Sequence, residues 1–260
     1  MIKFGPASLG GVKEAEKNLE EFHKLGLRAC EVSFTRGIYI KKEEDAKRIG
    51  KKAKELGIQL SIHAPYYINL NSTDKEVIKK SKQRILKCCE IGTHLGAYRV
   101  VFHAGFYGKI DRKESYENIK NQILDLQKSI KEKGYTPKLA PEIMGKINVF
   151  GSIEEIKKLT QETGCQFCID FAHILARYKN YNFKEVSEEF SKFDEWHVHF
   201  SGIEYGDKGE KHHKKTEESE FKRLFENLPS RKSIVIINES PDTLEDSVIG
   251  MNLYKHKFSK

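Results

Sequence analysis

Long apolar runs are absent from this 260-residue sequence, and none approaches the roughly twenty residues that a membrane-spanning helix needs. The opening residues Met1, Ile2 and Lys3 begin no signal-peptide pattern, and no Pro/Gly/Ser-rich linker or low-complexity segment interrupts the chain. We therefore expect a cytoplasmic protein without membrane contact. The even composition also predicts that residues 1–260 form a single domain.

Cysteine is scarce, and its odd, scattered set of five argues against a disulfide framework. Cys165 and Cys168 have the spacing of a metal-binding pair, but they lie in an apolar strand-like segment, where residues three apart point to opposite faces. We expect them to pack in the core. The sequence also shows no Ser/His/Asp or Cys/His nucleophile motif and no phosphate-binding glycine loop, so nothing indicates covalent catalysis.

Positive charge is in excess, with 46 Lys+Arg against 38 Asp+Glu, a formal net charge of +8 and a sequence pI of about 9.0. Much of this charge is mixed Lys/Glu on helical faces, which is typical of a solvated surface. The excess still favours an anionic partner, and nucleic acid is the commonest one.

Short apolar segments alternate about eight times with segments of helical periodicity, which predicts an α/β fold built as one (β/α)₈ TIM barrel. Ser152 and Glu155 form a capping-box pattern at the start of one helix. Residues 201–218 are expected to be a long irregular loop, which His212 and His213 mark as functional. The expected strands are Ile2–Gly5, Ala29–Phe34, Gln59–His63, Arg99–His103, Lys138–Ile143, Gln166–Asp170, Glu195–Phe200 and Ser233–Asn238.

Metal-capable side chains stand at the ends of six successive expected strands. In a TIM barrel the catalytic groups lie at the carboxyl ends of the strands, so these side chains are expected to converge. Imidazoles and carboxylates suit zinc or manganese, and a bridging carboxylate such as Glu142 would permit the paired ions that cleave phosphodiesters. His199 points to the same face as His197, so either is a candidate. The set is His63, His103, Glu142, Asp170, His173, His197 and Glu239.

Several strings in the chain are recognisable together: HAPYYINL at 63–70, FHAG at 102–105, CIDFAH at 168–173, HVHFSG, KHH at 211–213 and NESPD at 238–242. In this order they resemble the endonuclease IV family of apurinic/apyrimidinic endonucleases over essentially the whole chain. The resemblance implies a zinc-dependent phosphodiesterase of DNA base excision repair. Such an enzyme cleaves double-stranded DNA on the 5′ side of an abasic site, leaving a 3′-hydroxyl and a 5′-deoxyribose phosphate. It also implies a monomer associated with the nucleoid through DNA.

The resemblance further implies three zinc ions, with manganese as an alternative at one site. His197 is preferred over His199 because its distance to the KHH string matches the family spacing. The catalytic carboxylates would be Glu142, Asp170 and Glu239. The first ion would be held by His63, His103 and Glu142, the second by Glu142, Asp170, His197 and Glu239, and the third by His173, His212 and a carboxylate near position 210.

The third set departs from the family pattern, which has Asp-x-His where this chain has Glu210-Lys211-His212. Glu210 is the expected carboxylate, with Asp207 and Glu204 as alternatives in the same segment. His213 is an alternative imidazole.

Two further residues match the family's lesion-reading positions. Tyr66 matches a tyrosine that is pushed into DNA at the lesion, and Arg36 is a candidate for insertion into the minor groove. Both are expected DNA-binding residues.

Two other functions remain open from the residues alone. A single-metal sugar isomerase or epimerase of the xylose-isomerase-like barrels would need only Glu142, Asp170, His197 and Glu239. The remaining histidines and the basic charge favour the nuclease over this alternative. A non-catalytic nucleic-acid-binding barrel would not need so many imidazoles and carboxylates.

Overall fold

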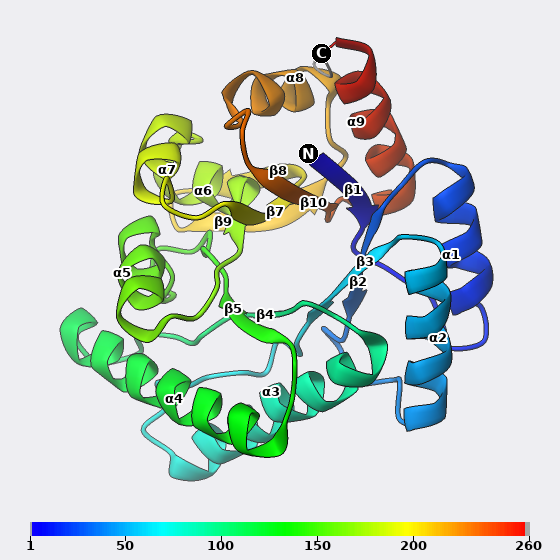
Figure 1. Cartoon of the computed structure of the whole chain (residues 1–260). Helices are drawn as coiled ribbons and strands as arrows, with labels where there is room; N and C mark the ends of the chain where they lie inside the picture. Colours follow the sequence, from blue (N-terminus) through cyan, green and yellow to red (C-terminus); the bar gives the residue numbers. More distant parts are fainter. Residues whose placement is uncertain (1, 258–260) are drawn as a thin grey trace.

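The computed structural model describes residues 2–257. Short strands alternate with longer helices along the chain, and the helices surround the strands (Figure 1). The strands are β1 (Ile2–Pro6), β2 (Ala29–Ser33), β3 (Gln59–His63), β4 (Arg99–Phe102), β5 (Lys138–Pro141), β6 (Ile169–Asp170), β7 (Glu195–Phe200), β8 (Gly202–Gly206), β9 (Gly209–Lys214) and β10 (Ser233–Asn238). The helices are α1 (Ala15–Lys24), α2 (Glu43–Glu55), α3 (Lys75–Leu95), α4 (Arg112–Lys133), α5 (Ile153–Thr163), α6 (Phe171–Tyr178), α7 (Phe183–Glu189), α8 (Glu218–Asn227) and α9 (Thr243–Lys257).

Eight of the strands close into a parallel barrel. Two parallel sheets have the strand orders β1-β10-β7-β6 and β2-β3-β4-β5. They join at one side through the parallel bridge between Glu142 and Cys168, next to β5 and β6. At the other side the amide of Arg28 donates to the carbonyl of Phe4 at 3.0 Å, linking the start of β2 to β1. The TIM barrel expected from the sequence is confirmed.

Local sequence explains where the outer helices begin and end. Asp111 caps α4 by accepting hydrogen bonds from two backbone amides of its first turn, and Gly134 closes the helix in the left-handed conformation. The capping box of Ser152 and Glu155 is present at α5. The helices run back along the outside of the barrel between parallel strands, so the loops after the strands gather at one face.

The segment expected to be an irregular loop is ordered instead. Residues after β7 form an antiparallel hairpin of β8 and β9, which returns over the carboxyl end of the barrel before α8. Gly209 at its tip approaches the β5–α5 loop so closely that a Cβ there would lie 2.1 Å from the carbonyl oxygen of Gly145. The hairpin is thus seated on the neighbouring loop.

One large apolar core packs between one face of the strands and the inner faces of the helices, and smaller clusters such as Val101, Ala140 and Cys168 stand apart from it on the other face of the strands. All five cysteines are free and buried. Among residues 2–257, no helix is long and apolar enough to cross a membrane.

Candidate metal centre

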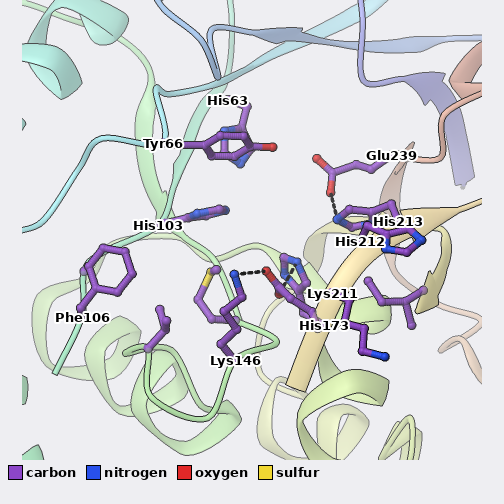
Figure 2. Close-up of a pocket in the computed structure, with 15 residues that line it drawn as sticks. His63, Tyr66, His103, Phe106, Lys146, His173, Lys211, His212, His213 and Glu239 are labelled. Carbon is purple, nitrogen blue, oxygen red and sulfur yellow. Dashed lines mark ion pairs between the residues drawn. The ribbon is translucent and has the colours of Figure 1, made fainter. Parts of the chain in front are cut away.

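Three groups of histidines and carboxylates meet at the carboxyl ends of the barrel strands, where Figure 2 shows His63, His103, His173, His213 and Glu239 around an open centre. Within each group the candidate ligand atoms lie within 4.8 Å of one another. Cluster A consists of His63, His103 and Glu142; cluster B of Glu142, Asp170, His199 and Glu239; and cluster C of Asp170, His173 and His213.

Cluster A is centred on one oxygen of Glu142. Its Oε2 lies 3.2 Å from Nε2 of His63 and 3.0 Å from Nε2 of His103. His63 stands at the end of β3, and its Nδ1 donates to the carbonyl of Ala64 at 2.8 Å. That hydrogen bond leaves Nε2 facing the carboxylate, the orientation of a metal-binding imidazole.

Cluster B places one imidazole among three carboxylates. Nδ1 of His199 lies 3.2 Å from Oε1 of Glu142 and 3.3 Å from Oε2 of Glu239. Burial, together with the nearby charges of Glu142 and Glu239, raises the pKa of Asp170 well above its usual range, although His173 opposes the rise. Three carboxylates at this spacing repel one another unless cations lie among them.

Cluster C joins the barrel to the hairpin. The Nδ1 of His173 donates to the carbonyl of Ile143 at 3.1 Å, and its Nε2 lies 3.0 Å from Oε2 of Glu210. Burial alone would raise the pKa of Glu210, but the charge and hydrogen bond of His173 hold it at about 2. His213 has its Nδ1 2.6 Å from the hydroxyl of Ser201, which leaves Nε2 directed toward Glu239 at 4.0 Å.

The donor set fits divalent metal ions. Asp170 Oδ2 is buried and has no aligned hydrogen bond, although Nδ1 of His173 lies 3.2 Å away, so its burial costs free energy unless a cation lies there. The Nδ1 of His63 and of His173 is bound to a carbonyl oxygen, which keeps the Nε2 lone pair available to a metal. Imidazole and carboxylate donors without thiolate suit zinc and manganese.

The sequence preference for His197 over His199 is not supported by the geometry. His199 pairs in register with Asp170 across β6 and β7, so it stands level with the other ligands. His197 lies two residues deeper on the same face and has its Nε2 3.0 Å from Glu31. Strand periodicity gives the face of a residue but not its depth in the barrel, which is why spacing alone does not separate the two histidines.

The preference for His212 is also not supported, because of a bulge in β9. Tyr205 pairs with Glu210 while Glu204 pairs with His212, so Lys211 is an extra residue in the ladder. The shift puts His213 on the face that carries Glu210. His212 is exposed at the cavity rim.

The carboxylate expected at position 210 is in place, and its alternatives are not. Glu210 faces His173, and a Cβ on Gly145 would lie 2.3 Å from its Oε2, so this glycine makes room for the side chain. Asp207 is exposed in the hairpin turn, and Glu204 is exposed and paired with Lys211 at 3.9 Å.

The two expected DNA-binding residues lie on adjacent loops at the rim. Tyr66 is 52% exposed, and its ring stacks on that of His103 with centroids 5.2 Å apart (Figure 2). Arg36 is exposed, and its carbonyl accepts a hydrogen bond from the Tyr67 hydroxyl at 3.1 Å. The amide of Tyr66 donates to the carbonyl of Thr35, so the two loops are joined.

A cavity of about 310 Å³ opens between the clusters and this rim. Phe106, Met144 and Val149 form part of its wall, and Lys146 and Lys211 lie at its lining. None of these residues was predicted as a site residue, because none is a typical metal ligand and a single apolar or lysine side chain gives no signal by itself.

A buried polar layer beneath cluster B was also missed. It contains Glu31, Ser61 and His197, with the Tyr98 hydroxyl 2.5 Å from Nδ1 of His197. A signal was present: Glu31 is the one charged residue in the strand ACEVS, where an apolar side chain is expected.

Comparison with known proteins places the chain in a family. Over residues 19–252 it matches the family described as xylose isomerase-like TIM barrel. An uncharacterized protein of Methanocaldococcus jannaschii is 35% identical over 98% of this chain and 97% of its own length. A probable endonuclease 4 of Aquifex aeolicus is 27% identical, and the match covers 69% of this chain and 64% of that protein.

Solved structures of two kinds share the fold. Endonuclease IV from Thermus thermophilus has a TM-score of 0.71 at 21% identity, covering 98% of this chain and 97% of that one. A D-psicose 3-epimerase from Clostridium cellulolyticum has a TM-score of 0.70 at 11% identity, covering 100% and 99%. At these identities the likeness concerns the fold alone. By its matched region and its barrel, the chain belongs to the xylose isomerase-like TIM barrel family.

Proposed function

We propose that this protein is a metal-dependent endonuclease that hydrolyses the phosphodiester on the 5′ side of abasic sites in duplex DNA, leaving a 3′-hydroxyl and a 5′-deoxyribose phosphate. The observation that carries the proposal is the sharing of carboxylates: Glu142 belongs to clusters A and B, and Asp170 to clusters B and C. Shared carboxylates hold cations side by side, as phosphodiester cleavage requires. The similarity to endonuclease 4 proteins supports the same reaction.

Zinc fits clusters A and C, which are richer in imidazole, and manganese is an alternative for the carboxylate-rich cluster B. When bound, such ions supply Lewis acidity toward phosphate oxygens and lower the pKa of water. Glu142, Asp170 and Glu239 would hold the ions at the reacting phosphate. No side chain of the protein needs to act as a nucleophile.

The cavity and its rim suit a nucleotide without a base. Such a nucleotide lacks stacking and pairing, so turning it out of the duplex costs little free energy. Tyr66 and Tyr67 are 52% and 58% exposed at the mouth and offer aromatic surface to the neighbouring bases. Lys146 and Lys211 lie where the DNA backbone would approach, and the net charge of +8 favours a polyanion.

A single-metal sugar epimerase is the second candidate, because cluster B alone holds a complete Glu, Asp, His, Glu set. The solved epimerases with the same fold support this reading. It gives no role to His63 and His103, which meet at Oε2 of Glu142, whereas the imidazole of cluster B faces Oε1.

Cluster A therefore separates the two functions. Zinc-loaded protein is assayed on a duplex with one abasic analogue and on a ketose, together with His63→Ala and His103→Ala. The endonuclease predicts chelator-sensitive nicking that both variants lose. Ketose interconversion that survives in both variants, with no nicking by the parent protein, would replace the endonuclease by the epimerase.

A further inference from the structure

Glu31 lies in the barrel interior directly beneath the proposed metal centre. It comes from β2 and is fully buried, as are His197 and His199. One oxygen, Oε2, lies 3.0 Å from Nε2 of His197 and accepts a hydrogen bond from the Ser61 hydroxyl at 2.8 Å. The other, Oε1, lies 3.0 Å from Nε2 of His199. Burying a carboxylate costs free energy unless it is paired and hydrogen-bonded. Here the two imidazoles are the partners, which suggests that the carboxylate holds them in place.

The hydrogen bonds around Glu31 fix which atoms carry protons. The Nε2 of His197 faces a carboxylate and therefore donates to it, which leaves Nδ1 of His197 to accept from the Tyr98 hydroxyl at 2.5 Å. His197 is thus saturated on both nitrogens by the protein itself. The Oε1 of Glu31 and the Nε2 of His199 are both buried without a hydrogen-bond partner and lie 3.0 Å apart, as an ion-pair contact rather than an aligned hydrogen bond.

His199 is oriented differently from His63. His63 presents Nε2 to Glu142 and uses Nδ1 to donate to a backbone carbonyl. His199 presents Nδ1 to Glu142 and Glu239, and its Nε2 points down to Glu31. Its metal-facing nitrogen is free only if the proton sits on Nε2.

We infer that Glu31 is a positioning residue that holds His199 with its Nε2 proton toward the carboxylate and its Nδ1 lone pair toward cluster B. A charged acceptor at position 31 raises the basicity of His199, the imidazole of cluster B, and so strengthens it as a metal ligand. Ser61 and His197 keep the Glu31 carboxylate in position through hydrogen bonds to its other oxygen. The inference rests on the proposed metal centre but not on the substrate.

The test is Glu31→Gln in the full chain, with zinc affinity measured by competition with a chromogenic chelator. The amide keeps the size of the side chain but loses the charge. We expect one zinc ion to bind about 10- to 100-fold more weakly, the range found for partners of metal ligands, while the others bind unchanged. Nitrogen-resolved NMR of the zinc form should show the His199 proton on Nε2 in the parent. At the same limiting free zinc, the variant should lose this pattern because its weaker site is emptied. Wild-type affinity for every ion in Glu31→Gln, or a parent His199 carrying its proton on Nδ1, would overturn the inference.

Glu155→Gln is the matched control. Glu155 lies on the outer helix α5, and like Glu31 it accepts hydrogen bonds, here from Gly151, Ser152 and Tyr107. It should leave every zinc affinity unchanged; a loss equal to that of Glu31→Gln contradicts the inference. If Glu31→Gln does not fold, Ser61→Ala tests the same hydrogen bonds and should weaken the same ion to a smaller extent. No effect on that ion in Ser61→Ala then contradicts the inference.

The buried polar layer around Glu31 could instead bind a metal ion itself, and a further variant tests this alternative. The Cys168 thiol lies within 4.8 Å of donor nitrogens of His197 and His199, so the layer is itself a candidate metal group. Cys168→Ser should leave the number of bound zinc ions unchanged if Glu31 positions His199. Loss of one ion in Cys168→Ser would show that the layer binds metal directly and would overturn the positioning role.

Discussion

Glu142 occupies the junction of clusters A and B, with Oε2 toward His63 and His103 and Oε1 toward His199. Burial alone would raise its pKa, yet the charge of His199 and the hydrogen bond from His103 hold that pKa well below its usual range. Because its two oxygens face different imidazoles, one carboxylate can serve two cations at once.

Glu142→Gln should keep the fold and lower kcat/KM on abasic duplex by at least about 100-fold, since a neutral amide cannot bridge two cations and even partners of metal ligands cost 10- to 100-fold. Metal content and steady-state kinetics measure the effect. His94→Ala is the control, because His94 lies on the outer helix α3 near Glu43. Equal losses in both variants would mean that the site has been misplaced.

Residue type and position relative to strand ends were enough to predict His63, His103, Glu142, Asp170, His173 and Glu239 as neighbours, and the structure brings them together. The choice between His197 and His199 was beyond the sequence, because both point into the barrel. What separates them is depth: His199 is level with Asp170, while His197 lies in the layer of Glu31.

At the scale of the elements, the helices and barrel strands follow from periodicity and caps, but the hairpin of β8 and β9 does not. The sequence of β9, GEKHHK, has no apolar residue, and β8 offers only Ile203 and Tyr205, too few to identify a strand by alternation. Its pairing comes from the register between its own strands and from its seat on the loop at Gly145. The bulge at Lys211 then decides which histidine faces the site.

His213→Ala should therefore remove or weaken one zinc ion and slow cleavage, whereas His212→Ala should retain full metal content. The two variants differ by one position in the same strand, so each controls for disturbance of the hairpin by the other. Zinc analysis after dialysis gives the answer. The reverse result, with His212→Ala losing the ion, would mean that the ladder of β9 is regular in the metal-bound protein.

At the scale of the whole molecule, the barrel was predictable from the sequence, but the arrangement of its rim was not. Eight β–α repeats in the sequence were sufficient to predict the architecture, because a parallel barrel requires that alternation. The sequence could not show how the rim is arranged, since the contact between the loops of Arg36 and Tyr67 runs through a backbone carbonyl that any residue would supply.

Affinity for abasic duplex should fall more than about tenfold between about 50 mM and about 200 mM salt, because lysine and arginine contacts to phosphates release counterions. Tyr66→Ala should reduce the preference for abasic over intact duplex and leave the salt slope unchanged, since its exposed ring carries no charge. Binding titrations at several salt concentrations measure both. Equal weakening toward the two duplexes would remove Tyr66 from lesion recognition.

We propose that shared carboxylates hold several metal ions in one site. The metal content of the purified protein, measured by elemental analysis against protein concentration after zinc loading and removal of weakly bound ions, tests this most directly. We expect one ion for each of clusters A, B and C. A single ion per chain, retained in His63→Ala and lost in Glu239→Gln, would contradict it and leave only the one-metal centre of an epimerase.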